Sequence, residues 1–298
     1  MLGLASFAMR GPLYAALPAS LLLALAVFLP PLAWLSAAVV ALVFLRKGIN
    51  DGLIVFAASA IAIGMFTAWQ TGNFPAGVKL VAAFWLPVIV LSLVLRETVD
   101  LGKTLLAAST AGLAVVGGFF VFMDDPAAFW EQQILTQFPV DQFSSQFPME
   151  QAALETFARQ SSLMMTGAFI TVMMLGALVS LIIARAWQAG LYNPGGFREE
   201  FHDLRLGKSP AILGLLMALA AVGTGLPIFM NAAPIVVALF FFQGLAVFHG
   251  VVARRQLSSG WLIGLYGLLL FLLPHTMILL GALGMADNWL NIRKRAGE

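Results

Sequence analysis

The chain has 298 residues, of which 61% are hydrophobic and only 10% are charged, and its formal net charge is +2. A soluble surface on a chain of this size needs far more charged residues, so the composition excludes an ordinary soluble globular protein. The absence of cysteine excludes disulfides, thiolate catalysis and cysteine-ligated metals.

Uncharged runs follow one another along the whole chain, and several approach the ~20 residues that a helix needs to cross a bilayer. Their hydrophobicity is continuous rather than alternating, which favours helices over a β-barrel. We therefore predict an all-α, polytopic transmembrane helical bundle of about 8–10 membrane segments that forms a single integral membrane domain over 1–298. The predicted helices cover about 12–28, 31–46, 51–69, 76–95, 101–123, 162–187, 210–225 and 228–251, followed by an apolar stretch at 259–287.

The distribution of basic residues predicts the orientation of the chain. If the N-terminus is cytoplasmic, eleven basic residues between the runs fall on the cytoplasmic side and only Lys79 and Arg159 fall outside, as the positive-inside rule requires. The basic residues lie one to three at a time, so no continuous basic face indicates nucleic acid as a partner. The lipid bilayer is the partner that the composition implies.

The segment 124–160 is the long polar stretch on the predicted outer side. It carries six acidic residues and one arginine. We predict an extracytoplasmic loop that caps the outer face, in which 149–159 can form a short amphipathic helix.

A second polar segment, 188–209, is predicted to be cytoplasmic and amphipathic. Its turn is Asn193-Pro194-Gly195-Gly196, and Phe197, Phe201 and Leu204 then follow at helical spacing. Two interpretations remain: the segment is an interfacial helix, or it docks a cytoplasmic partner. The candidate docking residues are Phe197, Arg198, Glu199, Phe201 and Arg205.

An enzymatic interpretation of this segment fails on spacing. Glu199, Glu200 and Arg205 resemble the paired-glutamate and arginine motif of intramembrane CAAX-type proteases, but the extra residue before the arginine turns it ~100° further around a helix. His202 lies at metal-ligating spacing from acidic neighbours, yet no HExxH pattern is present. We expect no enzymatic activity, no metal and no cofactor.

Polar residues within the predicted helices are few. No helix carries Asp, Glu, Lys or Arg near its centre, which argues against a proton pump or a carboxylate-based ion coupler. The candidates for binding a substrate are Gln243, Asn231, Thr224 and His275. Gln243 lies near mid-membrane, where its amide either bonds between helices or lines a cavity.

The last apolar stretch conflicts with the charge pattern, because one more crossing would put the basic tail outside. The uncharged run 261–286 is about 39 Å long as a helix, which is long for one crossing and short for two. Pro274 lies at its middle and removes a backbone donor. Either two half-length helices meet near Pro274 and His275 and return the tail to the cytoplasm, or one long helix tilts.

Three features carry a family resemblance. They are the Asn193-to-Arg198 turn, Gln243-Gly244 in a helix that ends at Arg254, and the tail Ala286-Asp287-Asn288-Trp289-Leu290 followed by Arg293. Over nearly its full length the chain resembles the YybS-like family (domain of unknown function 2232) of bacterial polytopic membrane proteins. The resemblance implies the bacterial inner membrane. Through the family's distant similarity to S components of energy-coupling factor transporters, it also implies transport.

Two functions remain open. The first is a transporter-like component that binds a small or lipid-linked molecule in a cavity near the outer half, beneath the 124–160 segment. No nucleotide-binding motif is present, so an ATP-driven step would need a cytoplasmic or membrane coupling subunit. The second is a non-transporting membrane scaffold or assembly factor of the bacterial envelope. A polar cavity of about 300 Å³ or more lined by Gln243 favours the first function, and a filled core favours the second.

Overall fold

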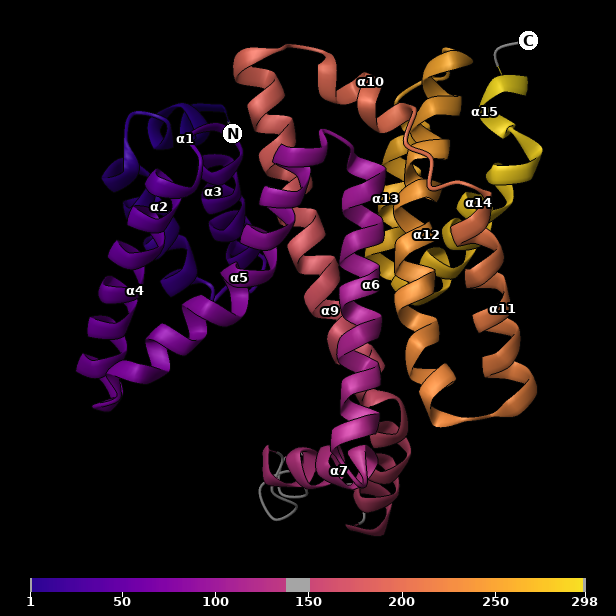
Figure 1. Ribbon diagram of the computed structural model, residues 1–298, viewed down its shortest axis with the longest axis horizontal. Coiled ribbons are helices and arrows are strands. Elements are labelled where there is room, and N and C mark those ends of the chain that lie inside the picture. Colours follow the sequence, from indigo (N-terminus) through magenta and orange to yellow (C-terminus); the bar gives the residue numbers. More distant parts are fainter. Residues whose placement is uncertain (1, 138–150, 297–298) are drawn as a thin grey trace. The chain divides into compact units, whose positions relative to one another are not determined.

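The computed structural model describes residues 2–137 and 151–296, and every regular element in these ranges is a helix (Figure 1). The predicted all-α fold class is confirmed. The part of the predicted 124–160 loop that falls on 138–150 lies outside the described residues.

The chain divides into two compact units. The first unit comprises Met1–Ala108 and Met173–Leu204, and the second comprises Ser109–Val172 and Arg205–Glu298. Two long helices, α6 (Leu101–Phe122) and α9 (Gln151–Tyr192), contribute residues to both units.

The first unit packs its helices around α3, whose residues from Ser36 to Leu45 are all buried. Gly64 of α4 and Gly77 of α5 let these two helices approach closely. A Cβ on Gly77 would meet the carbonyl oxygen of Ile63 at 2.6 Å. Small residues at such contacts let helix backbones approach closely. Besides parts of α6 and α9, the helices of this unit are α1 (Leu2–Ala8), α2 (Pro12–Leu25), α3 (Leu32–Arg46), α4 (Ile49–Thr71), α5 (Phe74–Thr98) and α10 (Gly196–His202).

The second unit is built around α12, which is buried along most of its length and lies beside α11 and α14 (Figure 1). Two glycines make the contact with α14 close: a Cβ on Gly244 would overlap the carbonyl oxygen of Leu280, and one on Gly284 would overlap that of Phe240. The helices of this unit are α7 (Pro126–Gln137), α11 (Lys208–Thr224), α12 (Pro227–Arg254), α13 (Gly260–Phe271), α14 (Leu273–Leu290) and α15 (Ile292–Arg295).

Five helices of the described chain are long and apolar enough to cross a membrane: α4, α5, α6, α9 and α12. Four shorter apolar helices of 12 to 17 residues, α2, α3, α11 and α13, accompany them. The chain is therefore a multi-pass membrane protein.

The last apolar stretch is broken into two helices, as the first of the two interpretations predicts. The break falls at Leu272, two residues before Pro274, because proline occupies the first turn of α14. Helix α13 is ~18 Å long and cannot cross a hydrocarbon core of ~30 Å. Arg254 at the end of α12 donates to the carbonyl of Arg293 (2.8 Å), so the tail returns to that end of α12.

Both predicted polar segments are more helical than expected. In the 124–160 segment, α7 follows directly after α6, and α9 begins at Gln151 rather than forming a separate short helix, since no proline interrupts it. In the 188–209 segment, α9 ends at Tyr192, Gly195 adopts a positive φ of 93°, and α10 follows for 7 residues.

Candidate functional site

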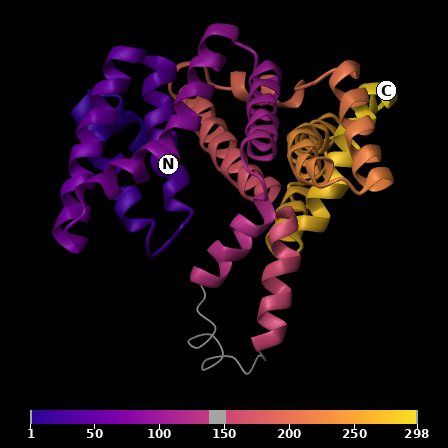
Figure 2. The same ribbon diagram turned by 60° about the horizontal axis from the view of Figure 1, so that its bottom comes forward.

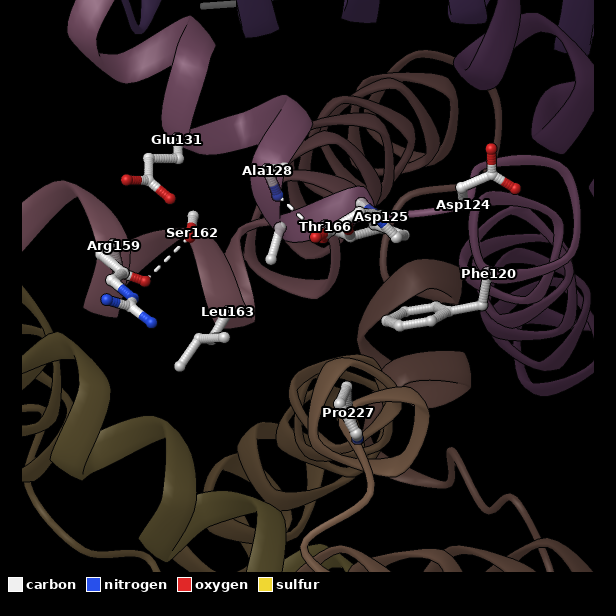
Figure 3. A pocket seen from close by; sticks show the side chains of 12 residues that line it. Phe120, Asp124, Asp125, Ala128, Glu131, Arg159, Ser162, Leu163, Thr166 and Pro227 are labelled. Carbon is white, nitrogen blue, oxygen red and sulfur yellow. Dashed lines mark hydrogen bonds between the residues drawn. The ribbon is translucent and has the colours of Figure 1, made fainter.

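Two polar clusters lie within the second unit, and the first surrounds a cavity of about 560 Å³. This volume is within the range of small-molecule sites. The cavity lies between the end of α6, helix α7, the early turns of α9 and the start of α12 (Figure 3). Its lining residues are Phe120, Asp124, Asp125, Pro126, Ala127, Ala128, Glu131, Arg159, Ser162, Leu163, Thr166 and Pro227.

The acidic pair Asp124-Asp125 marks the place where α6 gives way to α7. The Asp125 carboxylate accepts a hydrogen bond from the Ala128 amide (2.9 Å) and thereby caps the N-terminus of α7. Pro126 begins the helix, where its missing N–H leaves no bond unmade. Helix α6 thus ends at Phe122, and α7 begins at Pro126. Figure 2 brings this end of the unit forward, with α7 in magenta and the first turns of α9 in pink.

Helix α7 is fixed to its neighbours by an aromatic cluster around Trp130. The indole N–H of Trp130 donates to the Thr166 hydroxyl on α9 (2.9 Å). Its ring stacks on Phe119 of α6, with an interplanar angle of 13°, and contacts Phe169 of α9 at a centroid distance of 5.3 Å. Such aromatic pairs add to the stability that their burial provides. Helix α7 is therefore held in place beside the cavity.

The charged groups around the cavity do not neutralise one another. Three carboxylates, Asp124, Asp125 and Glu131, face one cation, Arg159, which gives the lining a formal charge of −2. Figure 3 shows Glu131 and Arg159 on one side and Asp124 on the other. Within 2–137 and 151–296, Asp124, Glu131 and Arg159 form no ion pair through their side chains. These charges are available to a ligand.

Asn231, a predicted substrate-binding residue, lies directly behind the cavity wall. It is 1% exposed; its side-chain oxygen accepts from the Gly167 amide (2.7 Å), and its amide donates to the Leu163 carbonyl (2.8 Å) and to the Pro227 carbonyl (2.9 Å). Asn231 thus bonds to two residues of α9, Leu163 and Gly167, and to Pro227 at the start of its own helix. It thereby helps to position two residues of the lining, Leu163 and Pro227.

Gln243 belongs to the second cluster and lies in the second half of α12. Its side chain is 0% exposed, and its oxygen accepts from the Leu206 amide (3.1 Å) and from Asn288 on α14 (3.4 Å). Asn288 in turn accepts from the Gly207 amide (3.0 Å). These bonds tie α12 and α14 to the segment before α11. Gln243 is not among the residues that line the 560 Å³ cavity.

Buried ion pairs complete this cluster, which we call the polar knot (Arg205, Gln243, Asp287, Asn288 and Arg293). The fully buried Asp287 carboxylate binds the Arg293 guanidinium at 2.8 Å and that of Arg205 at 3.8 Å. Sequence reasoning did not predict that Asp287, Asn288 and Arg293 are buried together. The signal was present in the family-like tail, which places an acid, an amide and an arginine within seven residues.

The two remaining substrate-binding candidates lie apart from both clusters. Thr224, at the end of α11, is exposed; its hydroxyl donates to the Ala220 carbonyl (2.7 Å) and accepts from the Leu226 amide (3.2 Å). His275 is exposed in the first turn of α14. Neither residue lines the cavity.

The predicted docking residues divide between the two units. Phe197 and Phe201 stack on each other along α10 with a centroid distance of 5.7 Å, while Arg198 and Glu199 of that helix are exposed. Arg205 belongs to the second unit, where it contributes to the polar knot.

These helices and their clusters define an all-α, polytopic membrane protein. More specifically, the chain belongs to the family described as "Predicted membrane protein (DUF2232)", whose family model matches residues 18–288. The match includes every residue that lines the cavity and all of the polar knot except Arg293. No curated protein and no solved structure matches the chain.

Proposed function

We propose that this protein is the substrate-binding component of a transporter in the bacterial inner membrane, with its N-terminus in the cytoplasm and with no enzymatic activity of its own. One observation supports the proposal most: a cavity of about 560 Å³ lies beside α7, and several charged side chains that line it have no ion-pair partner within the described residues, so that a ligand could pair with them. Apolar lining residues such as Phe120 and Leu163 provide contact area, while the few polar groups provide specificity.

The proposal also requires a source of energy. The chain contains no nucleotide-binding motif, so a coupling subunit would supply any ATP-driven step. The exposed charges of α10, Arg198 and Glu199, together with its Phe197–Phe201 pair, are the proposed docking surface. Co-purification of an ATPase or another coupling subunit, and its loss on Phe201→Ala, would support this part of the proposal.

Native mass spectrometry of the protein released from nanodiscs tests the cavity itself. We expect a small molecule to co-purify with the wild type and to be lost from Ala128→Trp, because the indole would fill the space beside the lining. Gln133→Trp is the matched control, since Gln133 is exposed on the same helix and does not line the cavity. If neither the wild type nor either variant carries a bound molecule in these spectra, the result would contradict the proposal.

A second candidate function is a non-transporting membrane scaffold of the bacterial envelope. It is favoured by the way in which Gln243 and Asn231 bond to backbone groups of neighbouring segments, as packing residues do. Under this alternative, Ala128→Trp leaves the cellular phenotype unchanged, whereas substitutions on the exposed face of α10 alter it.

A further inference from the structure

We infer that the cavity selects a small molecule that carries at least one ammonium group and also a hydrogen-bond acceptor. This inference rests on the proposed function and names the class of substrate. Within the described part of the second unit, the cavity is the place where several charged side chains without ion-pair partners line one recess.

The balance of charge selects a cation. Asp124 and Glu131 contribute carboxylates that no described basic residue neutralises, and Asp125 adds a third, which also caps α7. One guanidinium, that of Arg159, opposes them. A recess lined mostly by one sign of charge raises the local concentration of the opposite charge and repels like charge. A dianion would therefore be excluded.

A buried hydroxyl indicates the second feature of the ligand. Thr166 lines the cavity and is only 2% exposed. Its oxygen accepts the Trp130 N–H (2.9 Å), and its own hydrogen has no acceptor among the described residues. A buried donor without an acceptor is costly, so a ligand acceptor at this position would satisfy it. The hydroxyl of Ser162 is different, because it already donates to the Arg159 carbonyl (2.9 Å).

Arg159 restricts the class further. Its guanidinium is exposed and forms no ion pair within the described residues, so it can bind a carboxylate or carbonyl of the ligand through paired hydrogen bonds. Figure 3 places Arg159 beside Glu131, with Asp124 across the hollow. The lining therefore offers carboxylates for an ammonium group and, among them, donors for an acceptor.

Four six-carbon compounds test the inference because they differ only in their end groups: 1,6-diaminohexane, 6-aminohexanoate, 1,6-hexanediol and adipate. Binding to the purified full chain in nanodiscs is measured by calorimetry or by the shift in melting temperature. We expect the diamine and the amino acid to bind at least about tenfold more tightly than adipate, with an advantage that decreases as salt is added. Asp124→Asn and Glu131→Gln should each lower the affinity for the diamine about tenfold, whereas Glu97→Gln, an exposed acid of the first unit, should not.

The outcomes separate this inference from the proposed function. Adipate binding as tightly as the diamine, with both lost in Ala128→Trp, would overturn the charge inference and leave the cavity as a binding site. Unaltered diamine affinity in Asp124→Asn and Glu131→Gln would also overturn it. Failure of all four compounds to bind would overturn the inference as well, while a molecule that co-purifies in native mass spectrometry would still support the proposed function.

Thr166→Val tests the acceptor requirement separately. The substitution removes the hydroxyl and keeps the shape of the side chain. We expect it to weaken 6-aminohexanoate more than 1,6-diaminohexane, because the amino acid supplies a carbonyl-type acceptor. The matched control is Thr136→Val on the exposed side of α7, which should change neither affinity. Equal weakening of both compounds by Thr166→Val would contradict the acceptor requirement.

Discussion

The two polar clusters that pack beside α12 contain similar residue types and use them differently. In the polar knot, an acid, two amides and two arginines are mostly buried and bond to one another or to backbone groups. In the other cluster, three acids and an arginine surround a cavity, and most of their charge has no partner within the described residues. A polar residue type in a membrane helix therefore does not by itself reveal a site. The difference lies in whether the charge is already paired by the protein, as it is for Asp287 in the knot, where one amide nitrogen, Gln243 Nε2, is buried without a hydrogen-bond partner among the described residues.

The physical reason is the cost of desolvation. Removing one partner of a buried ion pair costs ~3–5 kcal/mol because the other charge remains buried. An exposed charge at the edge of a cavity retains its water until a ligand replaces that water. Substitutions in the knot should therefore change stability, and substitutions at the cavity should change binding.

The largest effect is expected where α12 and α14 touch. Gly284→Val would place a side chain against the carbonyl oxygen of Phe240 and the amide of Gly244, both of which are backbone atoms that cannot move aside cheaply. We expect loss of the folded protein, which fluorescence-detected gel filtration in detergent would show. The control is Gly264→Val on α13, where an added Cβ meets no atom within 4 Å. Equal yields of the two variants would refute the close approach of these helices.

The next largest effect is expected at the buried carboxylate. Asp287→Asn leaves the Arg293 guanidinium, which is 3% exposed, without its 2.8 Å counterion. We expect a loss of ~3–5 kcal/mol in the free energy of unfolding, measured in mixed micelles. Lys103→Gln, which removes an exposed pair with Asp100 (3.6 Å), should cost no more than ~1 kcal/mol. A loss at Asp287 as small as the loss at Lys103 would show that the knot is not a buried ion-pair cluster.

A smaller effect is expected at Asn231. This residue is buried, as Asp287 is, but it is uncharged and lies behind the wall of the cavity. Asn231→Leu keeps the branched shape of the side chain, although leucine is larger, and removes three hydrogen bonds to backbone groups. Since these buried backbone groups lose a side-chain partner, we expect a loss of ~2 kcal/mol in the free energy of unfolding. Ligand affinity should fall as well, because the wall moves. Thr224→Val, at an exposed position, should change both quantities little. Unchanged affinity in Asn231→Leu would remove its positioning role.

The smallest change in stability is expected at the cavity. Asp124 is exposed and has no side-chain partner in the described residues, so Asp124→Asn should leave the free energy of unfolding within ~0.5 kcal/mol of the wild type. Thermal unfolding without ligand provides this measurement. A large destabilisation would mean that Asp124 contributes to the fold in the way that Asp287 does, and the contrast between the two clusters would disappear.

Much of the fold could be predicted from hydrophobicity alone. Continuous apolar runs predicted the helices, and the conflict between charge and parity predicted the break in the last stretch. The break falls at Leu272 rather than at Pro274 because proline is favoured in the first turn of a helix. Helix α7 was missed because its composition resembles that of a polar loop. Its start depends on a local cap, Asp125-Pro126, within a segment that was interpreted only by its charge.

The candidate site was less predictable, and the reason is tertiary. The sequence indicated that Gln243 and Asn231 are polar groups in apolar helices, but their partners are backbone groups 37 and 64 residues away. No local pattern predicts such partners. The cavity lining comes from four helices, and its strongest local signal was the acidic pair Asp124-Asp125 directly after an uncharged span. Thr166 gave no signal, because its importance depends on a bond from Trp130.

The short helix α13 determines how the end of the chain can be inserted. Its 12 residues are too short to traverse the hydrocarbon, and Arg254 donates to the Arg293 carbonyl, so the segments 255–259 and 291–296 lie at the same end of α12. Helix α13 is too short to be a span on its own and packs against α12, with the Tyr266 hydroxyl 3.1 Å from His249 Nε2. A chain truncated after Phe271 would lack α14 and therefore leave Gly244 of α12 without the backbone of Leu280 against which it packs.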